Sequence, residues 1–287
     1  EERNSKVTNR IRSSGDVDLD CSSFKKTLDE VDAGVLWGPY YSLDELPVKD
    51  VSLAPRSGIW ECHGDSVEPS IRNIDDLLFG EQNTTAGYTH SHTPTDVDGI
   101  VAQVRAIAEH SPDESLVGWL SDFSKAYKQI PGDPQQLRDV VIAQYDPTRN
   151  DAAYFVPLCL VFGSKTAPLD FARFPAVMCE MVARLFRLPA THCVDDVIFV
   201  ESALAAPSGK LAWTGFVKLA GWLMSKAKEV EPSNLFNAIG ISVDLRQLPS
   251  GAASVLVTKR RVQSLRHLIR SILAKGKLGP GEAASLA

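Results

Sequence analysis

The chain has 287 residues, 44% of them hydrophobic, and a formal net charge of −6 at pH 7. That length suffices for one large domain or two smaller ones, and the acidic balance argues against nonspecific binding of nucleic acid by the whole surface, although it leaves room for a local basic groove. No apolar run approaches the length of a membrane span, no signal peptide is visible, and the scattered cysteines form no CxxC pair, so we expect an intracellular protein without a zinc or disulfide framework.

The first third of the chain predicts few regular elements. Residues 1–19 are polar and aperiodic, which predicts a disordered or poorly packed lead-in, and a helix is expected at 21–31. The segment 34–55 contains Gly-Pro and Leu-Pro breakers and is expected to be rich in loops. A short strand is expected at 71–74, and a helix capped by Thr95 follows, with apolar residues at helical spacing.

The middle of the chain predicts strands that end in polar or glycine residues. Residues 116–120 form an apolar run that leads into Asp122. Two further apolar runs, 140–145 and 153–160, predict a hairpin with a long loop. A helix is then expected to begin at Pro168, because proline suits the first turn of a helix.

The last third predicts strands and helices in irregular alternation. Residues 191–200 predict a strand, an Asp-Asp turn and a second strand, and 211–223 predict a helix. Residues 236–245 predict a strand or hairpin edge, and 255–273 end in a basic helix. Hairpins mixed with helices in this way favour an α+β fold over a doubly wound parallel sheet.

Two short acidic motifs are the main indication of function. Asp122 and the pair Asp195-Asp196 each stand at the end of an apolar run that predicts a buried strand. Neighbouring carboxylates repel one another and are costly to bury unless a cation joins them. A divalent-metal site for phosphoryl chemistry requires such a convergence of carboxylates from two strands. Each acid also has a plainer interpretation, because Asp is common in solvated turns and at the ends of strands.

The segment between the two acidic motifs strengthens the metal hypothesis. Phe162 and Gly163 break a strand, and this glycine turn opens the helix expected at Pro168. A helix N-terminus offers free backbone N–H groups that favour anions such as phosphates. An acid, a glycine-opened helix and an acid pair, in that order, predict nucleotidyl transfer.

These motifs resemble those of reverse transcriptases from retroelements, and among these they are most similar to the motifs of DIRS-type elements. Over about residues 30–287 the motifs follow the family's order: a fingers strand at 71–76, palm motifs at 122–130, 162–168 and 193–196, a lysine station at 221–228 and a glycine turn at 239–244. Cys193 stands where the family has an aromatic residue. The resemblance implies an α+β polymerase right-hand fold, with fingers, a palm whose antiparallel sheet carries helices on one face, and a truncated thumb.

The resemblance also implies a division of the chain. Residues 1–30 would be a partly disordered lead-in, 31–115 the fingers with an N-terminal extension, 116–250 the palm with the catalytic carboxylates, and 251–287 the start of a thumb opened by a segment like 281–287. Both ends of the sequence resemble cuts, so a fragment of a longer protein is expected.

The implied catalytic roles fall on four residues. Asp122, Asp195 and Asp196 would hold two Mg²⁺ ions, for which Mn²⁺ could substitute. Lys228 would give a proton to the leaving pyrophosphate, and Lys226 competes for that role.

The implied binding roles cover nucleotide and nucleic acid. Tyr127 would screen ribose from deoxyribose, and the nucleotide would also contact Arg72, Phe162 and Gly163. Contacts to the primer and its RNA or DNA template would come from Pro168 and from the basic run Lys259, Arg260, Arg261, Arg266 and Arg270. The implied partners are therefore a primed template and deoxynucleoside triphosphates, without a membrane.

Other interpretations stay open. The lysine station and the basic run also fit ordinary solvated charges. A decayed or repurposed copy would keep the fold and bind nucleic acid without polymerising, and the shortage of basic residues near Arg72 favours it, whereas the intact acids oppose it. An RNA-dependent RNA polymerase shares the acids, but the bulk of Tyr127 disfavours it. His90 and His92 precede a helix cap in a polar run, which we interpret as a surface loop rather than a metal cluster.

Overall fold

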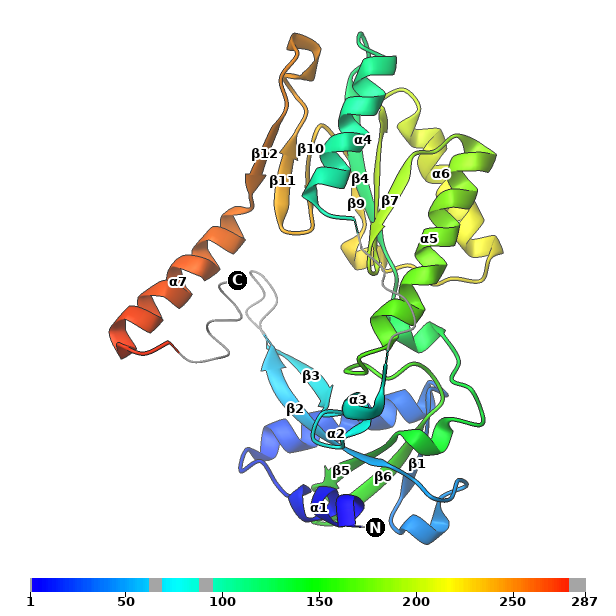
Figure 1. Cartoon of the computed structure of the whole chain (residues 1–287), viewed down its shortest axis with the longest axis vertical. Coiled ribbons are helices and arrows are strands. Elements are labelled where there is room, and N and C mark those ends of the chain that lie inside the picture. The colour runs from blue at the N-terminus through cyan, green and yellow to red at the C-terminus, as the bar shows by residue number, and fades with distance from the viewer. Residues whose placement is uncertain (1, 62–68, 88–94, 279–287) are drawn as a thin grey trace. The chain divides into compact units, whose positions relative to one another are not determined.

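The computed structural model describes residues 2–61, 69–87 and 95–278. The chain folds into two compact units. The first unit comprises Glu1–His92 and Lys125–Arg173, and the second unit comprises Thr93–Ser124 and Phe174–Ala287. One of the three chain positions at which the units meet falls within helix α5 (Ala167–Phe186), and Figure 1 labels most elements of both units.

The first unit is built on a five-stranded sheet in the order β1-β6-β5-β2-β3. Neighbouring strands are antiparallel except for the parallel pair β2 and β5. Its elements are α1 (Glu2–Arg10), α2 (Val17–Asp32), β1 (Leu36–Tyr40), β2 (Leu53–Glu61), β3 (Ser70–Asp75), α3 (Gln82–Thr85), β5 (Val141–Asp146) and β6 (Asp151–Pro157), with 3-10 helices at Leu43–Glu45, Ala126–Gln129 and Leu137–Asp139.

Alternating side chains of β5 place two helices on opposite faces of this sheet. Val141 and Ala143 point to a core shared with Val7 of α1, whereas Ile142 packs with Phe24 of α2. Period-two alternation in a strand produces this two-sided burial. The α2 helix confirms the helix expected at 21–31.

The expectation of a disordered lead-in is wrong for α1. Val7 is fully buried, and the Asn4 side chain hydrogen-bonds the backbone of the segment that leads into β2, donating to Val51 O at 2.7 Å and accepting from Leu53 N at 3.0 Å. Arg10 adds an ion pair to Asp76 at 3.2 Å. Contacts of this kind dock a helix whose sequence is mostly polar, and they leave no periodic signal.

The expectation of loops at 34–55 is wrong at both ends of the segment. Strand β1 contains Pro39, which an edge strand tolerates because proline lacks only an N–H donor. Strand β2 contains Pro55, which precedes Arg56, the first residue of β2 that pairs with β3. Each proline therefore lies where the sheet does not need its donor.

The second unit contains a four-stranded antiparallel sheet, β7-β8-β4-β9, and a three-stranded antiparallel sheet, β10-β11-β12. Its elements are α4 (Val97–His110), β4 (Leu116–Asp122), β7 (Ala190–Cys193), β8 (Asp196–Ser202), α6 (Ala206–Leu219), β9 (Val230–Ser233), β10 (Leu235–Ala238), β11 (Ile241–Asp244), β12 (Ser254–Val257) and α7 (Lys259–Lys275), with 3-10 helices at Lys226–Lys228 and Leu248–Ser250. The strand expected at 116–120, the two strands expected within 191–200 and the strand or hairpin edge expected at 236–245 are confirmed. The helix expected at 211–223 is present as α6, which begins and ends earlier.

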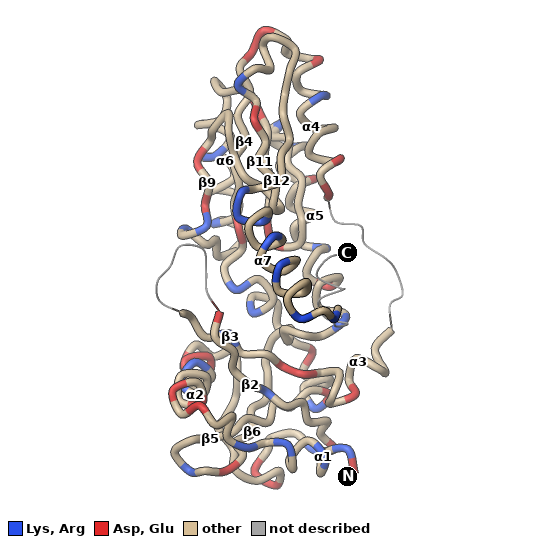
Figure 2. The backbone as a smooth tube through the Cα atoms, turned by 90° about the vertical axis from the view of Figure 1, so that its left-hand side faces the viewer, with Lys and Arg blue, Asp and Glu red and all other residues tan. Residues whose placement is uncertain are grey.

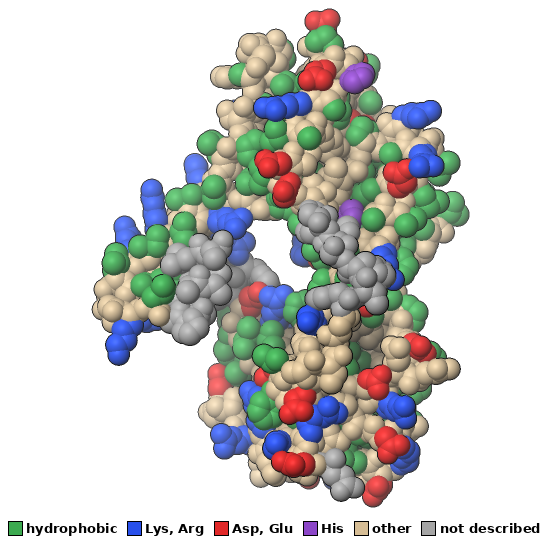
Figure 3. All heavy atoms as spheres, in the orientation of Figure 1, with side chains coloured by type: hydrophobic (Ala, Val, Ile, Leu, Met, Phe, Trp, Pro, Cys, Tyr) green, Lys and Arg blue, Asp and Glu red, His purple; other side chains and the backbone are tan. Residues whose placement is uncertain are grey.

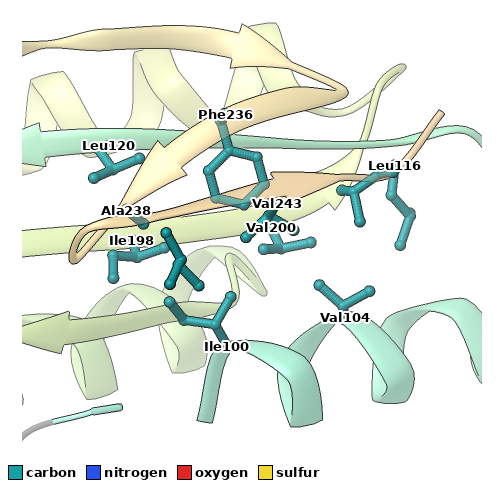
Figure 4. Packing of buried hydrophobic residues seen from close by; sticks show 11 residues of the cluster. Ile100, Val104, Leu116, Leu120, Ile198, Val200, Phe236, Ala238 and Val243 are labelled. Atoms are coloured by element: carbon teal, nitrogen blue, oxygen red, sulfur yellow. The ribbon is translucent and has the colours of Figure 1, made fainter. Parts of the chain in front are cut away.

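The two faces of the four-stranded sheet are covered differently. Leu120 and Ile198 pack with Ile100 of α4 and with Phe236 of the smaller sheet, as Figure 4 shows. On the opposite face Trp119 stacks on Phe199 at 3.7 Å between ring centroids, and Phe199 meets Trp213 of α6 at 5.1 Å. The fold is α+β as expected, but helices lie on both faces of this sheet rather than on one.

Three local features complete the second unit. The N-cap of α4 is Asp96, which accepts from Gly99 N at 3.0 Å, rather than Thr95. Helix α7 exposes an apolar stripe at Leu265, Ile269 and Leu273, as its amphipathic sequence predicts. Across the residues that the structure describes, no helix is long and apolar enough to cross a membrane.

Candidate functional site

The paired strands β4 and β8 bring the predicted acids together. Asp122, the last residue of β4, lies directly opposite Asp196, the first residue of β8. Asp195 belongs to the two-residue turn between β7 and β8, and its carbonyl accepts from Phe123 N at 3.2 Å. All three acids belong to the second unit, and they gather at one end of its four-stranded sheet.

The turn before the acids is conformationally strained. Val194 has a φ of 55°, in the left-handed region that a β-branched side chain rarely adopts. Such strain persists only where the surroundings impose it, and it concentrates at functional sites. Here the strained turn places Asp195 and Asp196 in succession at the tip of the hairpin.

Burial and mutual repulsion raise the pKa of two of the acids. For Asp196 burial is the main cause, and the charges of Asp195 and Asp122 add to it, raising the pKa from 3.8 to about 6. The pKa of Asp195 is also raised, first by burial and then by Asp122. A site that makes carboxylates this reluctant to ionise favours a cation that would relieve the repulsion.

Lys228 supplies a cation from the chain itself. Its Nζ donates to Asp122 Oδ2 at 3.0 Å, and Ser225 N donates to Asp122 O at 2.8 Å, which anchors the segment that carries the lysine. Burial alone would lower the pKa of Lys228, but the hydrogen bond and the nearby acids raise it. Both Lys226 and Lys228 are exposed, but it is Lys228 whose Nζ contacts an acid, so the structure brings Lys228 to the site.

The three acids are of the residue type that binds divalent cations, but their side chains are not positioned as a complete set of metal ligands. Asp122 is 4% exposed, and its Oδ1 is buried without a hydrogen-bond partner. Carboxylate oxygens are the ligands that Mg²⁺ and Mn²⁺ prefer. Within 2–61, 69–87 and 95–278, however, no group of three His, Cys, Asp or Glu side chains is arranged to hold a metal. The two-metal site therefore stays a prediction.

A cavity of about 590 Å³ opens beside the acids within the second unit. Its walls include Asp196, Lys228, the β10–β11 turn at Gly240, and Arg260 and Arg261 of α7. Two of the basic residues predicted to bind nucleic acid therefore lie at the same cavity as an acid, whereas Lys259, Arg266 and Arg270 do not line it. Basic positions continue along α7 in the coloured tube of Figure 2, and Figure 3 shows basic side chains on that part of the surface.

The residues predicted to bind nucleotide come together in the first unit. The Arg72 guanidinium lies 5.0 Å from the centre of the Phe162 ring, and the Tyr127 ring lies 5.8 Å from the same ring. Tyr127 also meets the edge of Phe171 at 5.6 Å. Phe162 therefore lies next to both Arg72 and Tyr127. Arg72 also pairs with Glu61 at 2.9 Å.

Gly163 is required by the local backbone. Its φ is 97°, and a Cβ there would lie 2.6 Å from the carbonyl oxygen of Asp75. Asn83 holds the turn from both sides, donating to Gly163 O at 2.9 Å and accepting from Lys165 N at 2.8 Å. Pro168 follows in the first turn of α5, as expected.

Sequence reasoning missed several charged residues near Arg72. Lys26, Arg56 and Lys128 line one cavity with it, although they lie far apart in the sequence. Lys128 lies within the palm motif at 122–130 without a role assigned to it, and no motif contains Lys26 or Arg56. Arg56 is buried, with 8% exposed. His90, His92 and the expected thumb segment 281–287 lie outside the described residues.

Among known proteins, the chain is similar to several solved structures. No family model and no curated protein matches the chain. The foamy viral protease-reverse transcriptase in complex with double-stranded DNA is similar, with a TM-score of 0.59, 12% identity, and coverage of 85% of this chain and 36% of that one. Native and CSH-mutant crystal structures of the Prototype Foamy Virus protease-reverse transcriptase give TM-scores of 0.58 and 0.56 and identities of 14% and 16%, each covering 80% of this chain and 26% of theirs.

The chain thus has a reverse-transcriptase-like fold of the α+β class. At this level of identity the likeness concerns the fold, and the chain spans 26% to 36% of the length of these structures. The coarse expectation of a polymerase fold is confirmed, whereas the DIRS-type assignment, the roles of individual residues and the division into lead-in, fingers, palm and thumb stay predictions.

Proposed function

We propose that the chain carries the catalytic core of a reverse transcriptase that extends a primer on an RNA or DNA template. The observation that carries this proposal is the pairing of Asp122 with Asp196 across β4 and β8, with Asp195 in the adjoining turn, in a fold similar to that of reverse transcriptases. One of these structures is described as a complex with double-stranded DNA, which supports nucleic acid as the partner.

In the proposed reaction the primer 3′-oxygen forms a bond to the α-phosphorus of a deoxynucleoside triphosphate, and the bond from that phosphorus to the bridging oxygen of pyrophosphate breaks. Asp122, Asp195 and Asp196 would hold the divalent ions. The chemistry that two bound Mg²⁺ ions, or Mn²⁺ in their place, would supply is activation of the hydroxyl and stabilisation of charge on the leaving group.

The remaining roles fall on residues whose positions suit them. Lys228, protonated beside Asp122, is the proposed proton donor to pyrophosphate. Tyr127, held between Phe162 and Phe171, would block a ribose 2′-hydroxyl, and Arg72 would bind triphosphate oxygens. The basic residues of α7 would contact the backbone phosphates of the primed template. Origin from a DIRS-type retroelement is the finer part of this proposal, and it rests on the motifs of the sequence.

The proposal is tested by primer extension with purified chain, primed RNA and DNA templates, the four deoxynucleoside triphosphates and Mg²⁺. Wild type should extend the primer, and Asp122→Asn should lower the rate by several orders of magnitude. Asp113→Asn is the matched control, because Asp113 is exposed in the loop before β4. Binding of primed template without extension under any divalent cation would instead support a copy that has lost polymerisation.

A further inference from the structure

The first unit contains a small cavity of about 170 Å³ with a cationic lining. Its charged residues are Lys26, Arg56, Arg72, Lys128, Glu30 and Asp75. Four basic side chains around one cavity are notable in a chain with a formal net charge of −6. They come from α2, β2, β3 and the 3-10 helix Ala126–Gln129, so folding alone assembles them.

Arg56 is the fully compensated member of this set. Its Nε and Nη2 donate to the two carboxylate oxygens of Asp75 at 2.6 and 3.0 Å, and its Nη1 donates to Glu30 at 3.0 Å. The side chain is 5% exposed, and a guanidinium buried to this degree requires such partners. Arg56 is therefore a fixed part of the wall, and it holds Glu30 in place.

Lys128 and Arg72 are compensated only in part. Lys128 forms an ion pair with Glu30, but it shares that carboxylate with Arg56. Arg72 pairs with Glu61, and 43% of its side chain is exposed. Both cations therefore keep the capacity to bind a further anion that enters the cavity.

Lys26 has no carboxylate partner among the contacts recorded in the described residues. Its Nζ donates to the backbone carbonyl of Ile71, the residue before Arg72. Burial lowers the pKa of Lys26, and the charges of Lys128 and Arg72 lower it further against two nearby glutamates. Repulsion between neighbouring positive charges destabilises the empty cavity, and a bound polyanion would relieve that repulsion.

We propose that Lys26 and Lys128 join Arg72 in binding the triphosphate of the incoming nucleotide, with Glu30 and Arg56 as positioning residues that hold Lys128. The inference rests on the proposed polymerase function. Few basic residues lie near Arg72 in the sequence. Lys26 of α2 and Lys128 of the 3-10 helix after β4 bring positive charge to Arg72 in the folded chain.

The size and surroundings of the cavity favour phosphate groups over a whole nucleotide. Its volume of about 170 Å³ lies below the range of about 300–1,000 Å³ typical of complete small-molecule sites. Phe162 lines the same cavity and lies against Arg72, so a ring surface adjoins the phosphate-sized space. A triphosphate is the part of a nucleotide that three converging cations recognise.

The test measures binding of inorganic tripolyphosphate and of dTTP to the whole chain by isothermal titration calorimetry. Lys26→Gln and Lys128→Gln should each raise the Kd for both ligands by about tenfold, the usual effect of losing one charge-assisted hydrogen bond. Lys25→Gln is the matched control: it removes the same charge from the neighbouring position of α2, which does not line the cavity, and should leave both Kd values unchanged.

Two further variants separate binding from folding. Because Lys128→Gln leaves Glu30 with less compensation, Lys128→Arg keeps the charge and should restore binding, and thermal unfolding checks that each variant is folded. Lys26 pairs with a carbonyl rather than an acid, so Lys26→Gln carries little risk to the fold. Wild-type Kd values in both folded lysine variants would overturn the inference.

A second arm distinguishes the source of the phosphates. If the lysine variants weakened binding of a single-stranded oligonucleotide while tripolyphosphate affinity stayed unchanged, the site would belong to a nucleic-acid backbone and the inference would be wrong.

The polymerase proposal can fail separately. If wild type bound tripolyphosphate through the two lysines but did not extend a primer, the phosphate site would exist without polymerisation. Extension by wild type with an unchanged dTTP KM in the lysine variants would overturn only the present inference.

Discussion

Replacing Asp196 with Asn is expected to stabilise the metal-free protein at pH 7. The carboxyl of Asp196 is crowded by burial and by Asp195 and Asp122, and its pKa is raised from 3.8 to about 6. At pH 7 the folded protein must therefore ionise a group that resists ionisation. Asn has nearly the same shape without the charge, so it removes this penalty.

The magnitude follows from the size of the pKa shift. A shift of about two units corresponds to at most about 3 kcal/mol, since each unit is worth about 1.4 kcal/mol. The side chain is partly exposed, so solvent screening leaves about 1–2 kcal/mol. For a protein of this size that free energy raises Tm by roughly 2–8 °C.

The sign of the pH dependence is fixed by the direction of the shift. A carboxyl whose pKa is raised on folding contributes stability below its unfolded pKa of 3.8, and that contribution is lost as the pH rises to about 6. The stability difference between variant and wild type should therefore vanish near pH 4, grow between about pH 4 and 6, and stay constant above pH 6.

The assay is thermal unfolding from pH 4 to 8 in EDTA and again in excess Mg²⁺, with Asp113→Asn as the control for loss of an exposed carboxylate. Wild type should gain stability from Mg²⁺, and Asp196→Asn should gain less. If Asp196→Asn unfolded at or below the wild-type Tm in EDTA at every pH, the carboxylates would not repel one another and the acid cluster described above would be wrong.

Three further changes test other parts of the structure. Tyr127→Val should raise incorporation of ribonucleotides relative to deoxyribonucleotides in single-nucleotide extension, because it removes the bulk proposed to exclude the 2′-hydroxyl; unchanged selectivity would make this ring a core aromatic. Arg56→Met should lower the free energy of unfolding in urea by about 3–5 kcal/mol, because buried Asp75 loses its ion pair and Glu30 keeps only Lys128, and a loss below about 1 kcal/mol would contradict the buried network. Neutralising the basic face of α7 should lower the salt slope of primed-template binding by about one for each lost phosphate contact, and an unaltered slope would mark a solvated surface; the substituted residues are Arg260, Arg261, Arg266 and Arg270.

The placement of the acids could be predicted from the sequence because local patterns determine it. An uninterrupted apolar run, 197–200, predicts a strand buried on both faces, and two acids directly before it must lie at the strand's end. The pairing of Asp122 with Asp196 needs only that this hairpin lie beside the strand ending at Asp122.

The cationic cavity could not be predicted, because its members are brought together by tertiary contacts. Lys128 reaches Glu30 across 98 positions of the sequence, and Arg56 reaches Asp75 across a hairpin whose first strand contains a proline. Helix α1 was also missed, since a buried valine, an asparagine and an arginine that pairs with Asp76 dock it. No spacing rule reports interactions of this kind.

The central claim, that the three acids form one site for divalent cations, is tested most directly by titrating Mn²⁺ into the chain and following free Mn²⁺ by electron paramagnetic resonance. Wild type should take up Mn²⁺, with tighter uptake when dTTP is present. Asp122→Asn should abolish that uptake, and Asp113→Asn should leave it intact. Equal Mn²⁺ uptake by wild type and Asp122→Asn, or none by wild type with dTTP present, would contradict the account.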